Sequence, residues 1–246
     1  MTLQPSPSRS RIRLSLTLMA LWAAQAEGVS LQTISDFDYD FDNNGGVTYP
    51  LQQDFKGVED VTFTFLESDP GGNENGNYTA DFTGFGGQPS YLQQEIRFFE
   101  FTPHALTAAF AMDFAIPLEA GDLLLFLDFD LMEESASIRA FSPEGTEITD
   151  LSGWTYNEYP GQTGVSDNTH QWDPATAQLT TDDSTAGNVA LPLATLTLDQ
   201  PVGRLEYLFT YAEEGGMSFQ VATLVPEPST ASLLAGCALL LLRRRR

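Results

Sequence analysis

The sequence predicts an all-β protein, organised as an antiparallel β-sandwich of the jelly-roll type. Apolar and polar residues alternate in many segments, as in Val61–Phe65, which reads VTFTF. An alternation of period two places the apolar side chains on one face of a strand. Roughly ten short candidate strands are separated by Gly, Pro, Asp and Asn, and no internal segment shows the 3.6-residue period of an amphipathic helix. Many short strands joined by such turns are typical of sandwiches and jelly rolls.

The expected strands follow one another through the middle of the chain. They are Asp36–Asp42, Val61–Phe65, Tyr78–Phe85, Ile96–Phe101, Leu106–Ile116, Leu123–Leu131, Ser137–Phe141, Ala190–Leu198, Leu205–Tyr211 and Ser218–Leu224. Turns are expected at Pro117–Asp122 and Ser142–Gly145 because Pro, Gly and Asp cluster there. Ser68–Asn77 and Leu151–Asp183 lack the alternation, and we expect both to be long loops.

The N-terminal 26 residues have the three parts of a secretory signal peptide. Arg9, Arg11 and Arg13 form a basic region, Leu14–Ala23 is apolar, and Ala24-Gln25-Ala26 has small residues at the two positions that define a cleavage site. This order predicts cleavage after Ala26, with residues 27–224 as the exported domain. The alternative is that the segment forms the first helix of the fold.

The exported domain is strongly acidic. Residues 27–224 contain 33 acidic and four basic side chains, which gives a formal net charge of −29. Such a charge repels nucleic acid and anionic lipid and favours cations such as Ca²⁺; the alternative is that it serves solubility alone. The single cysteine, Cys237, lies outside this domain, so the domain has neither a disulfide nor a cysteine metal site.

The last 22 residues, 225–246, predict a short membrane anchor. Pro226-Glu227-Pro228 interrupts regular structure, a mainly apolar run ends at Leu242, and Arg243, Arg244, Arg245 and Arg246 follow. A helix over 229–242 would span about 21 Å, which is short for a hydrocarbon core of about 30 Å. The arginines favour a cytoplasmic C-terminus. A buried helix of a soluble domain is the alternative.

This order of Pro-Glu-Pro, short apolar helix and arginine cluster resembles the PEP-CTERM sorting signal of Gram-negative bacteria. The resemblance covers Val225–Arg246 only. It implies that an exosortase-type transpeptidase recognises Pro226, Glu227 and Pro228 and cuts near them. It further implies that the protein is held transiently in the inner membrane and then passed to the cell surface or exopolysaccharide matrix.

One acidic segment resembles the start of a calcium-binding loop. Asp40, Asp42 and Asn44 stand at alternate positions before Gly45, as in D-x-D-x-[DN]-G. Alternate oxygen ligands on a tight turn suit Ca²⁺, but Leu51 stands where an EF-hand has its bidentate Glu. The alternative is the solvent face of a strand followed by a turn. Asp128 and Asp130 form a second, weaker cation candidate.

Aromatic residues in 151–183 suggest a carbohydrate-binding surface. Trp154, Tyr156, Tyr159 and Trp172 lie among Gly, Asn, Asp and Thr, a mixture in which rings stack on sugars and polar groups bind hydroxyls. The alternative is that these rings pack the segment against the sheet.

The sequence leaves three functions open. The first is a non-enzymatic surface or matrix protein, the second is a carbohydrate-binding module of the same fold, and the third is a secreted polysaccharide hydrolase. No G-x-S-x-G, H-E-x-x-H or phosphate-binding loop is present, and carboxylates are too abundant to single out a catalytic pair. We therefore name no catalytic residue.

Overall fold

The computed structural model has an all-β domain, as the sequence predicts. It describes residues 29–34, 50–66, 76–84, 87–101, 107–127, 134–159, 170–181, 193–210 and 217–226. These residues form strands and one 3₁₀ helix, η2 (Ser90–Leu92), and none of them is in an α-helix. Contacts group Leu31–Leu224 into one compact unit, and the two terminal segments form another. Two antiparallel sheets make up the domain, which is consistent with a β-sandwich.

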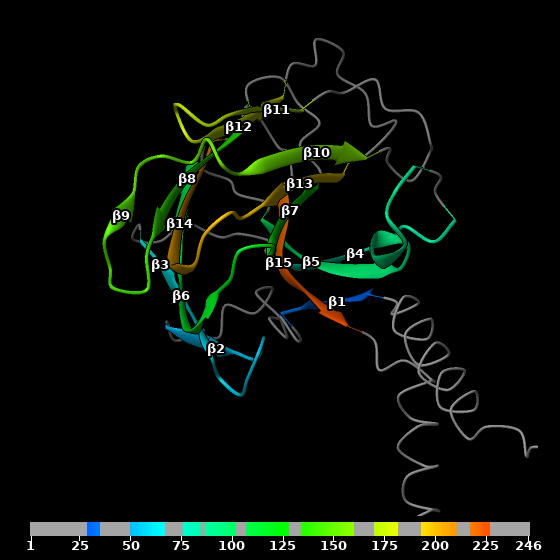
Figure 1. Cartoon of the computed structure of the whole chain (residues 1–246), viewed down its shortest axis with the longest axis horizontal. Helices are drawn as coiled ribbons and strands as arrows, with labels where there is room; N and C mark the ends of the chain where they lie inside the picture. Colours follow the sequence, from blue (N-terminus) through cyan, green and yellow to red (C-terminus); the bar gives the residue numbers. More distant parts are fainter. Residues whose placement is uncertain are drawn as a thin grey trace, which may run out of the picture. The chain divides into compact units, whose positions relative to one another are not determined.

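The first sheet has seven strands, with β15 near its centre (Figure 1). Its main order is β10 (Thr155–Tyr159), β13 (Leu193–Thr197), β7 (Leu123–Leu127), β15 (Met217–Pro226), β5 (Glu95–Phe101) and β4 (Gly76–Asp81), and β1 (Val29–Thr33) also pairs with β15.

The second sheet has eight strands, with β14 near its centre. Its main order is β11 (His170–Asp173), β12 (Gln178–Thr181), β8 (Ser135–Phe141), β14 (Val202–Thr210), β6 (Thr107–Leu118), β3 (Val61–Phe65) and β2 (Leu51–Gln53), and β9 (Glu147–Ile148) also pairs with β8.

Successive strands alternate between the two sheets. From β5 to β8, and again from β12 to β15, each strand lies in the sheet opposite to the one before it. As a result β15 pairs with both β5 and β7, and β14 pairs with both β6 and β8. Neighbouring strands are thus distant in sequence, and turns from separate parts of the chain meet at the ends of the sandwich.

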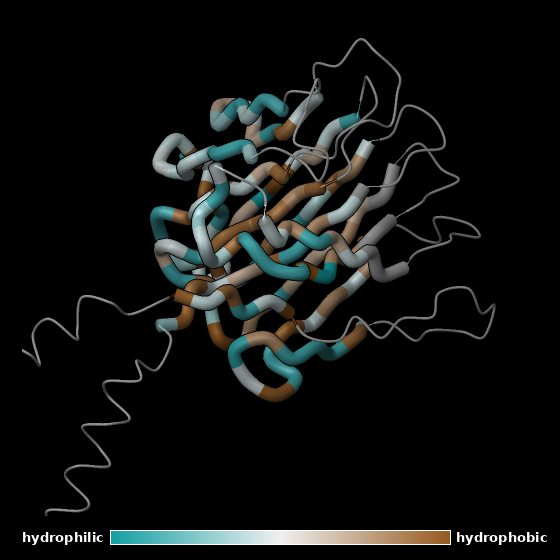
Figure 2. Tube along the Cα trace, turned by 90° about the vertical axis from the view of Figure 1, so that its right-hand side faces the viewer, coloured by the Kyte–Doolittle hydropathy of each residue, from teal (hydrophilic) through white to brown (hydrophobic). Residues whose placement is uncertain are grey.

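Stacked aromatic rings fill the space between the sheets. Phe110 of β6 lies 4.8 Å from Phe63 in its own sheet and 4.8 Å from Phe219 of the other sheet, between ring centroids. Tyr207 and Phe209 on β14 also stack on Phe110. All five rings are almost fully buried. The alternation in β3 and β14 therefore arises because one face of each strand enters this core, while polar residues gather in the turns (Figure 2).

A second apolar cluster covers the other face of the first sheet. Phe98 and Leu125 are buried there with Phe82 and with Leu92 of η2. Strand β7 contributes to both clusters, and all five of its residues are buried. Burial on both faces explains why β7 reads as a continuous apolar run (LLLFL) instead of an alternation.

Most of the expected strands are present. The expected strand at 36–42 lies outside the described residues, β1, β2 and β9 are additional short strands, and two further regions differ. Residues 151–183, expected to be a loop, contain β10, β11 and β12; these are short strands at or next to sheet edges and are rich in polar residues, so they lack an apolar pattern. Strand β6 extends to Leu118 and includes Pro117, where the pairing register with β14 shifts. Proline is tolerated at such an irregularity because the regular ladder is interrupted there.

Several predicted features lie outside the described residues. They include the calcium-loop residues Asp40, Asp42 and Asn44, the signal-peptide positions Ala24 and Ala26, and the sorting-signal residues Glu227, Pro228 and Arg243–Arg246. Pro226 is described: it is exposed and ends β15. Within the described part of the chain, no helix is long and apolar enough to span a bilayer.

Tyr207 provides a test of the core packing. Its hydroxyl is buried without a hydrogen-bond partner among the described residues, and burial raises the pKa of this phenol. Tyr207→Phe removes the unsatisfied group and should change the free energy of unfolding by less than about 1 kcal/mol. Tyr207→Ala removes the stacked ring and should cost about 3–5 kcal/mol. Urea denaturation measures both, and a Tyr207→Phe loss as large as that of Tyr207→Ala would show that the hydroxyl has a partner.

Candidate functional site

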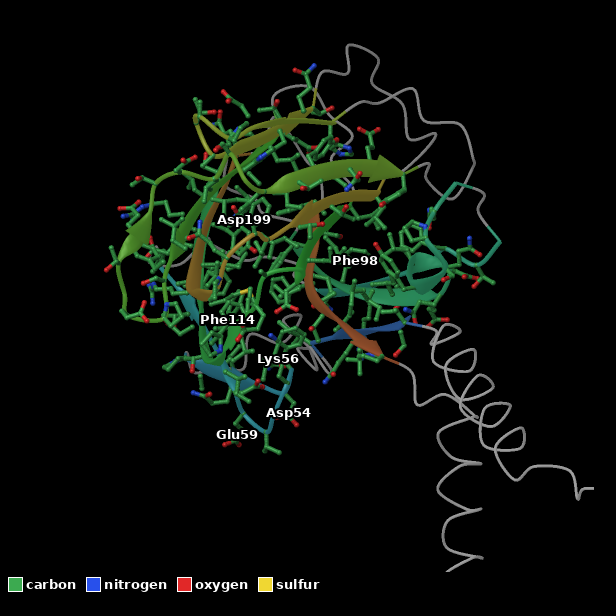
Figure 3. The ribbon with its side chains drawn as sticks, viewed as in Figure 1. Asp54, Lys56, Glu59, Phe98, Phe114 and Asp199 are labelled. Atoms are coloured by element: carbon green, nitrogen blue, oxygen red, sulfur yellow. The ribbon has the colours of Figure 1, made fainter. Side chains whose placement is uncertain are left out.

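A polar hollow lies where three connections meet at one end of the sandwich. The turn between β8 and β9, the segment from β9 to β10 and the turn between β13 and β14 line an open hollow of about 640 Å³. Figure 3 labels Asp199, which belongs to the last of these turns. Most of the lining groups are hydroxyls, carboxylates and an amide, contributed by Ser142, Thr146, Glu147, Asp150, Asp199 and Gln200.

The turn at Ser142–Gly145 forms as the sequence predicts. Gly145 donates its backbone N–H to the carbonyl of Ser142 at 2.8 Å, with Pro143 at the second turn position. Gly145 has a φ of +82°, a conformation that glycine adopts without strain. The backbone N–H of Ser142 donates to the carbonyl of Thr146 at 2.8 Å, which closes the hairpin into β9. This turn fixes one wall of the hollow.

Asp150 is held at the rim by a local turn. The backbone N–H of Ser152 donates to Oδ1 of Asp150 at 3.0 Å, as in the turns that Asp forms with the backbone two residues ahead. Hydrogen bonds from Ser152, first from its side chain and then from its backbone, lower the pKa of Asp150. The carboxylate is exposed, so its oxygens are accessible from solvent.

Gly153 allows the side chain of Asp199 to lie close against the backbone. A Cβ at Gly153 would overlap Oδ2 of Asp199, so the carboxylate occupies the place of a side chain. The contact joins segments that are distant in sequence. It positions the Asp199 carboxylate over the Gly153 backbone, and both residues line the hollow.

An ion-pair ladder on the second sheet ends at the hollow. Arg139 on β8 pairs with Glu147 of the hollow at 2.8 Å and with Glu206 at 2.7 Å. Arg204 pairs with Glu206 at 3.0 Å and with Asp113 at 2.7 Å. The hydrogen bond from Arg139 lowers the pKa of Glu147. The Arg139–Glu147 link is largely exposed and contributes little to stability, whereas Glu206, in the middle of the ladder, is only 17% exposed.

A second ion pair lies elsewhere and is much less exposed. Nζ of Lys56 lies 2.6 Å from Oδ2 of Asp122, and the two side chains are 15% and 6% exposed. Asp60 accepts the backbone N–H groups of Phe55 and Lys56 at 2.7 and 2.9 Å. The ion pair, with a hydrogen bond from Nζ of Lys56 to the carbonyl of Pro117, fastens the loop after β2 to the region where β6 ends, and the Asp60 bonds hold the loop itself in shape. Lys56 is labelled in Figure 3. The role of these contacts is structural.

The predicted aromatic surface is not one surface in the structure. Trp154 is 4% exposed and belongs to the main core, where its ring stacks on Trp172 at 6.0 Å. Tyr156 and Trp172 pack partly buried against the same core, whereas Tyr159 packs against the second cluster. A ring as buried as Trp154 cannot stack on a sugar. Trp154 therefore packs the segment against the sheet, as the alternative interpretation of the sequence had it. A glycan contact by Tyr156, Tyr159 and Trp172, which are partly exposed, stays a prediction.

The same segment joins the edges of the two sheets. Tyr156 on β10 places its hydroxyl 2.9 Å from the carbonyl of His170 on β11. The backbone N–H of His170 donates to Oε2 of Glu158 at 2.9 Å. Strand β10 is an edge of the first sheet and β11 an edge of the second. These contacts join the two sheets along one side of the sandwich. Tyr156 therefore has a structural role.

The described residues contain no cluster of the kind that holds a metal ion. None of their His, Cys, Asp and Glu side chains gather in a group of three or more that could hold a metal ion. The His170 ring is buried, with Nδ1 3.8 Å from Oε2 of Glu158. His104 lies outside the described residues.

Sequence reasoning did not single out the residues of the hollow. Acidic residues in turns are common throughout the domain, so Asp150 and Asp199 carry no distinctive local pattern. The sequence Ser-Pro-Glu-Gly predicts a turn, but nothing in it indicates that the turn lines a binding site. The meeting of three connections depends on strand order.

Two glycines test how the hollow is built. A Cβ at Gly153 meets the mobile end of the Asp199 side chain, whereas a Cβ at Gly203 would lie 2.7 Å from the Cα of Pro143. A side chain can move aside but a backbone cannot, so Gly153→Ala should cost less than about 1 kcal/mol and Gly203→Ala about 1–3 kcal/mol. Thermal unfolding of both variants checks this order, and the reverse order would contradict the contact between Gly153 and Asp199.

The two kinds of ion pair give a second prediction. Lys56→Met leaves the Asp122 carboxylate buried without its cation and should cost about 3 kcal/mol. Arg139→Met breaks the pairs with Glu147 and Glu206, but the Arg139 side chain is 56% exposed and Glu206 keeps its pair with Arg204, so the change should cost no more than about 1 kcal/mol. Chemical denaturation of the two variants compares the losses. Equal small losses would mean that solvent reaches the Lys56–Asp122 pair.

Comparisons with known proteins find only distant structural similarity. No family model matches the sequence, and no curated protein matches it. The enzymatically active domain of tailspike protein 4 from bacteriophage CBA120 aligns with 68% of this chain and 19% of its own, at 14% identity and a TM-score of 0.31. A mutant of a family 29 carbohydrate-binding module aligns with 67% of this chain and 92% of its own, at 10% identity and a TM-score of 0.27. Another structure of such a module has 13% identity and a TM-score of 0.23. TM-scores this low leave the function of this chain unassigned.

Proposed function

We propose that this protein is an exported, non-enzymatic protein of the cell surface or extracellular matrix, and that its sandwich binds carbohydrate. The observation that carries the binding role is the hollow of about 640 Å³ at one end of the sandwich. Its volume lies within the range of about 300–1,000 Å³ typical of small-ligand sites. The export role rests on the signal-peptide pattern and on the resemblance of Val225–Arg246 to a sorting signal.

The chemistry of the hollow suits sugar hydroxyls. Thr146 and Thr149 supply hydroxyls that both donate and accept, and Asp150 and Asp199 supply strong acceptors. The site is open and exposed, which suits a segment of a long polymer better than an enclosed small molecule. We propose that the protein binds carbohydrate and does not cleave it.

We propose that the sandwich is a jelly roll. The support is the alternation of successive strands between sheets, which gives the orders β5-β15-β7-β13 and β6-β14-β8-β12. Two interlocked sets of four strands are the arrangement of that fold. Here the connection from β8 to β12 carries β9, β10 and β11, and it builds two sides of the hollow.

The two ends of the chain would direct the export of this domain and its transient attachment to the membrane. In the proposal the signal peptide ending at Ala26 directs export, and the apolar run to Leu242 holds the protein in the inner membrane. An exosortase-type transpeptidase then acts near Pro226–Pro228. Exopolysaccharide is the partner that such a domain would meet outside the cell.

Binding is tested with the full chain on immobilised polysaccharides. Gly153→Ala should weaken retention about tenfold or more, because the new Cβ displaces the Asp199 carboxylate from the hollow. Asp173→Ala is the matched control: this exposed aspartate caps the β11–β12 turn and does not line the hollow. Retention of no polysaccharide, or equal retention of Gly153→Ala and the native chain, would overturn the proposal.

Export is tested separately through the termini of the protein recovered from cells. Mass spectrometry should find a chain that starts at Glu27 and ends near Pro226–Pro228. The intact 246-residue chain in the cytosol would contradict both processing steps.

A further inference from the structure

The geometry points to a glycan with free amino groups as the ligand of the hollow. The inference rests on the proposed carbohydrate binding and narrows its ligand to amino sugars that are not acetylated. Two features of the molecule support it: carboxylates line the hollow, and most basic side chains of the domain are already held in ion pairs.

The hollow presents carboxylates without a neighbouring free cation. Glu147, Asp150 and Asp199 line it, and none of its described lining residues is basic. The carboxylate of Glu147 is paired with Arg139, whereas Asp150 and Asp199 have no cationic partner among the described residues. Two carboxylates at the mouth of one hollow therefore remain available to a positively charged ligand.

Most of the basic residues of the domain are already paired with carboxylates, which leaves few cations for an anionic ligand. Of its four basic residues, Lys56, Arg139 and Arg204 are held in ion pairs and Arg97 also has an interaction partner. The domain carries a net charge of −29. Polymers of uronic acids or sulfated sugars would be repelled both at long range and at the hollow.

The available carboxylates match an ammonium group on a sugar. An ammonium donates up to three hydrogen bonds, and bonds between charged groups are about twice as strong as neutral ones. Hydrogen bonds lower the pKa of Asp150, which keeps this carboxylate ionised when the medium becomes mildly acidic. Acetylation of the amine removes the charge and adds bulk, so the acetylated sugar loses this attraction.

The test uses calorimetry on the full chain with three short oligosaccharide probes. They are glucosamine oligomers, the same oligomers fully N-acetylated, and oligogalacturonate. Glucosamine oligomers should bind at least about tenfold more tightly than the acetylated ones, oligogalacturonate should not bind, and added salt should weaken the binding.

Two variants, each of which removes one negative charge, distinguish binding at the hollow from attraction to the acidic surface as a whole. Asp199→Asn should weaken glucosamine binding about tenfold. Asp173→Asn removes one exposed charge outside the hollow and should leave the affinity within about twofold, because long-range screening makes a distant charge weak.

The outcomes distinguish this inference from the proposed function. If acetylated oligomers bind as tightly as free amines, or if Asp199→Asn and Asp173→Asn behave alike, the amino-sugar inference is wrong and carbohydrate binding stands. If none of the probes binds and no polysaccharide retains the protein, both are wrong.

Discussion

The stacking of aromatic rings between the two sheets is the contact on which the rest of the structure depends. Phe110 contacts rings from both sheets, and the strands that carry those rings come from distant parts of the chain. Once these faces pack together, strand order is fixed, and strand order brings the β8–β9 and β13–β14 turns to one end of the sandwich. The domain has no cysteine, so burial of these rings together with the aliphatic residues of the two clusters must supply most of its stability.

Charge is the second constraint. A domain with so few basic residues uses them for structure: Lys56 fastens a loop to the β6–β7 turn, and two arginines link four strands of the second sheet. Each cation neutralises acids that would otherwise repel one another within the fold. The many remaining acids give the domain its negative potential, and among the described residues Asp150 and Asp199 of the hollow have no cationic partner.

The sequence allowed the fold class to be predicted better than the site. Strands β3 and β14 were predictable because one face of each enters the core, and β7 because both of its faces do. Strands β10, β11 and β12 were not, since they lie at or next to sheet edges and have no apolar run. Aromatic composition could not say whether Trp154 faces solvent or core; the ring is buried because β10 closes the side of the sandwich. Asp150 and Asp199 meet in one hollow only through strand order, which no local pattern encodes.

The most direct test of the central claim is hydrogen exchange of the full chain, followed by mass spectrometry, with and without a saturating glucosamine oligomer. If the hollow is the binding site, exchange should slow in residues 142–153 and 199–200, which form its walls, and stay unchanged at the β11–β12 turn. Slowing confined to the partly exposed rings Tyr159 and Trp172, or no slowing in the walls at saturation, would contradict the account and place binding elsewhere on the molecule.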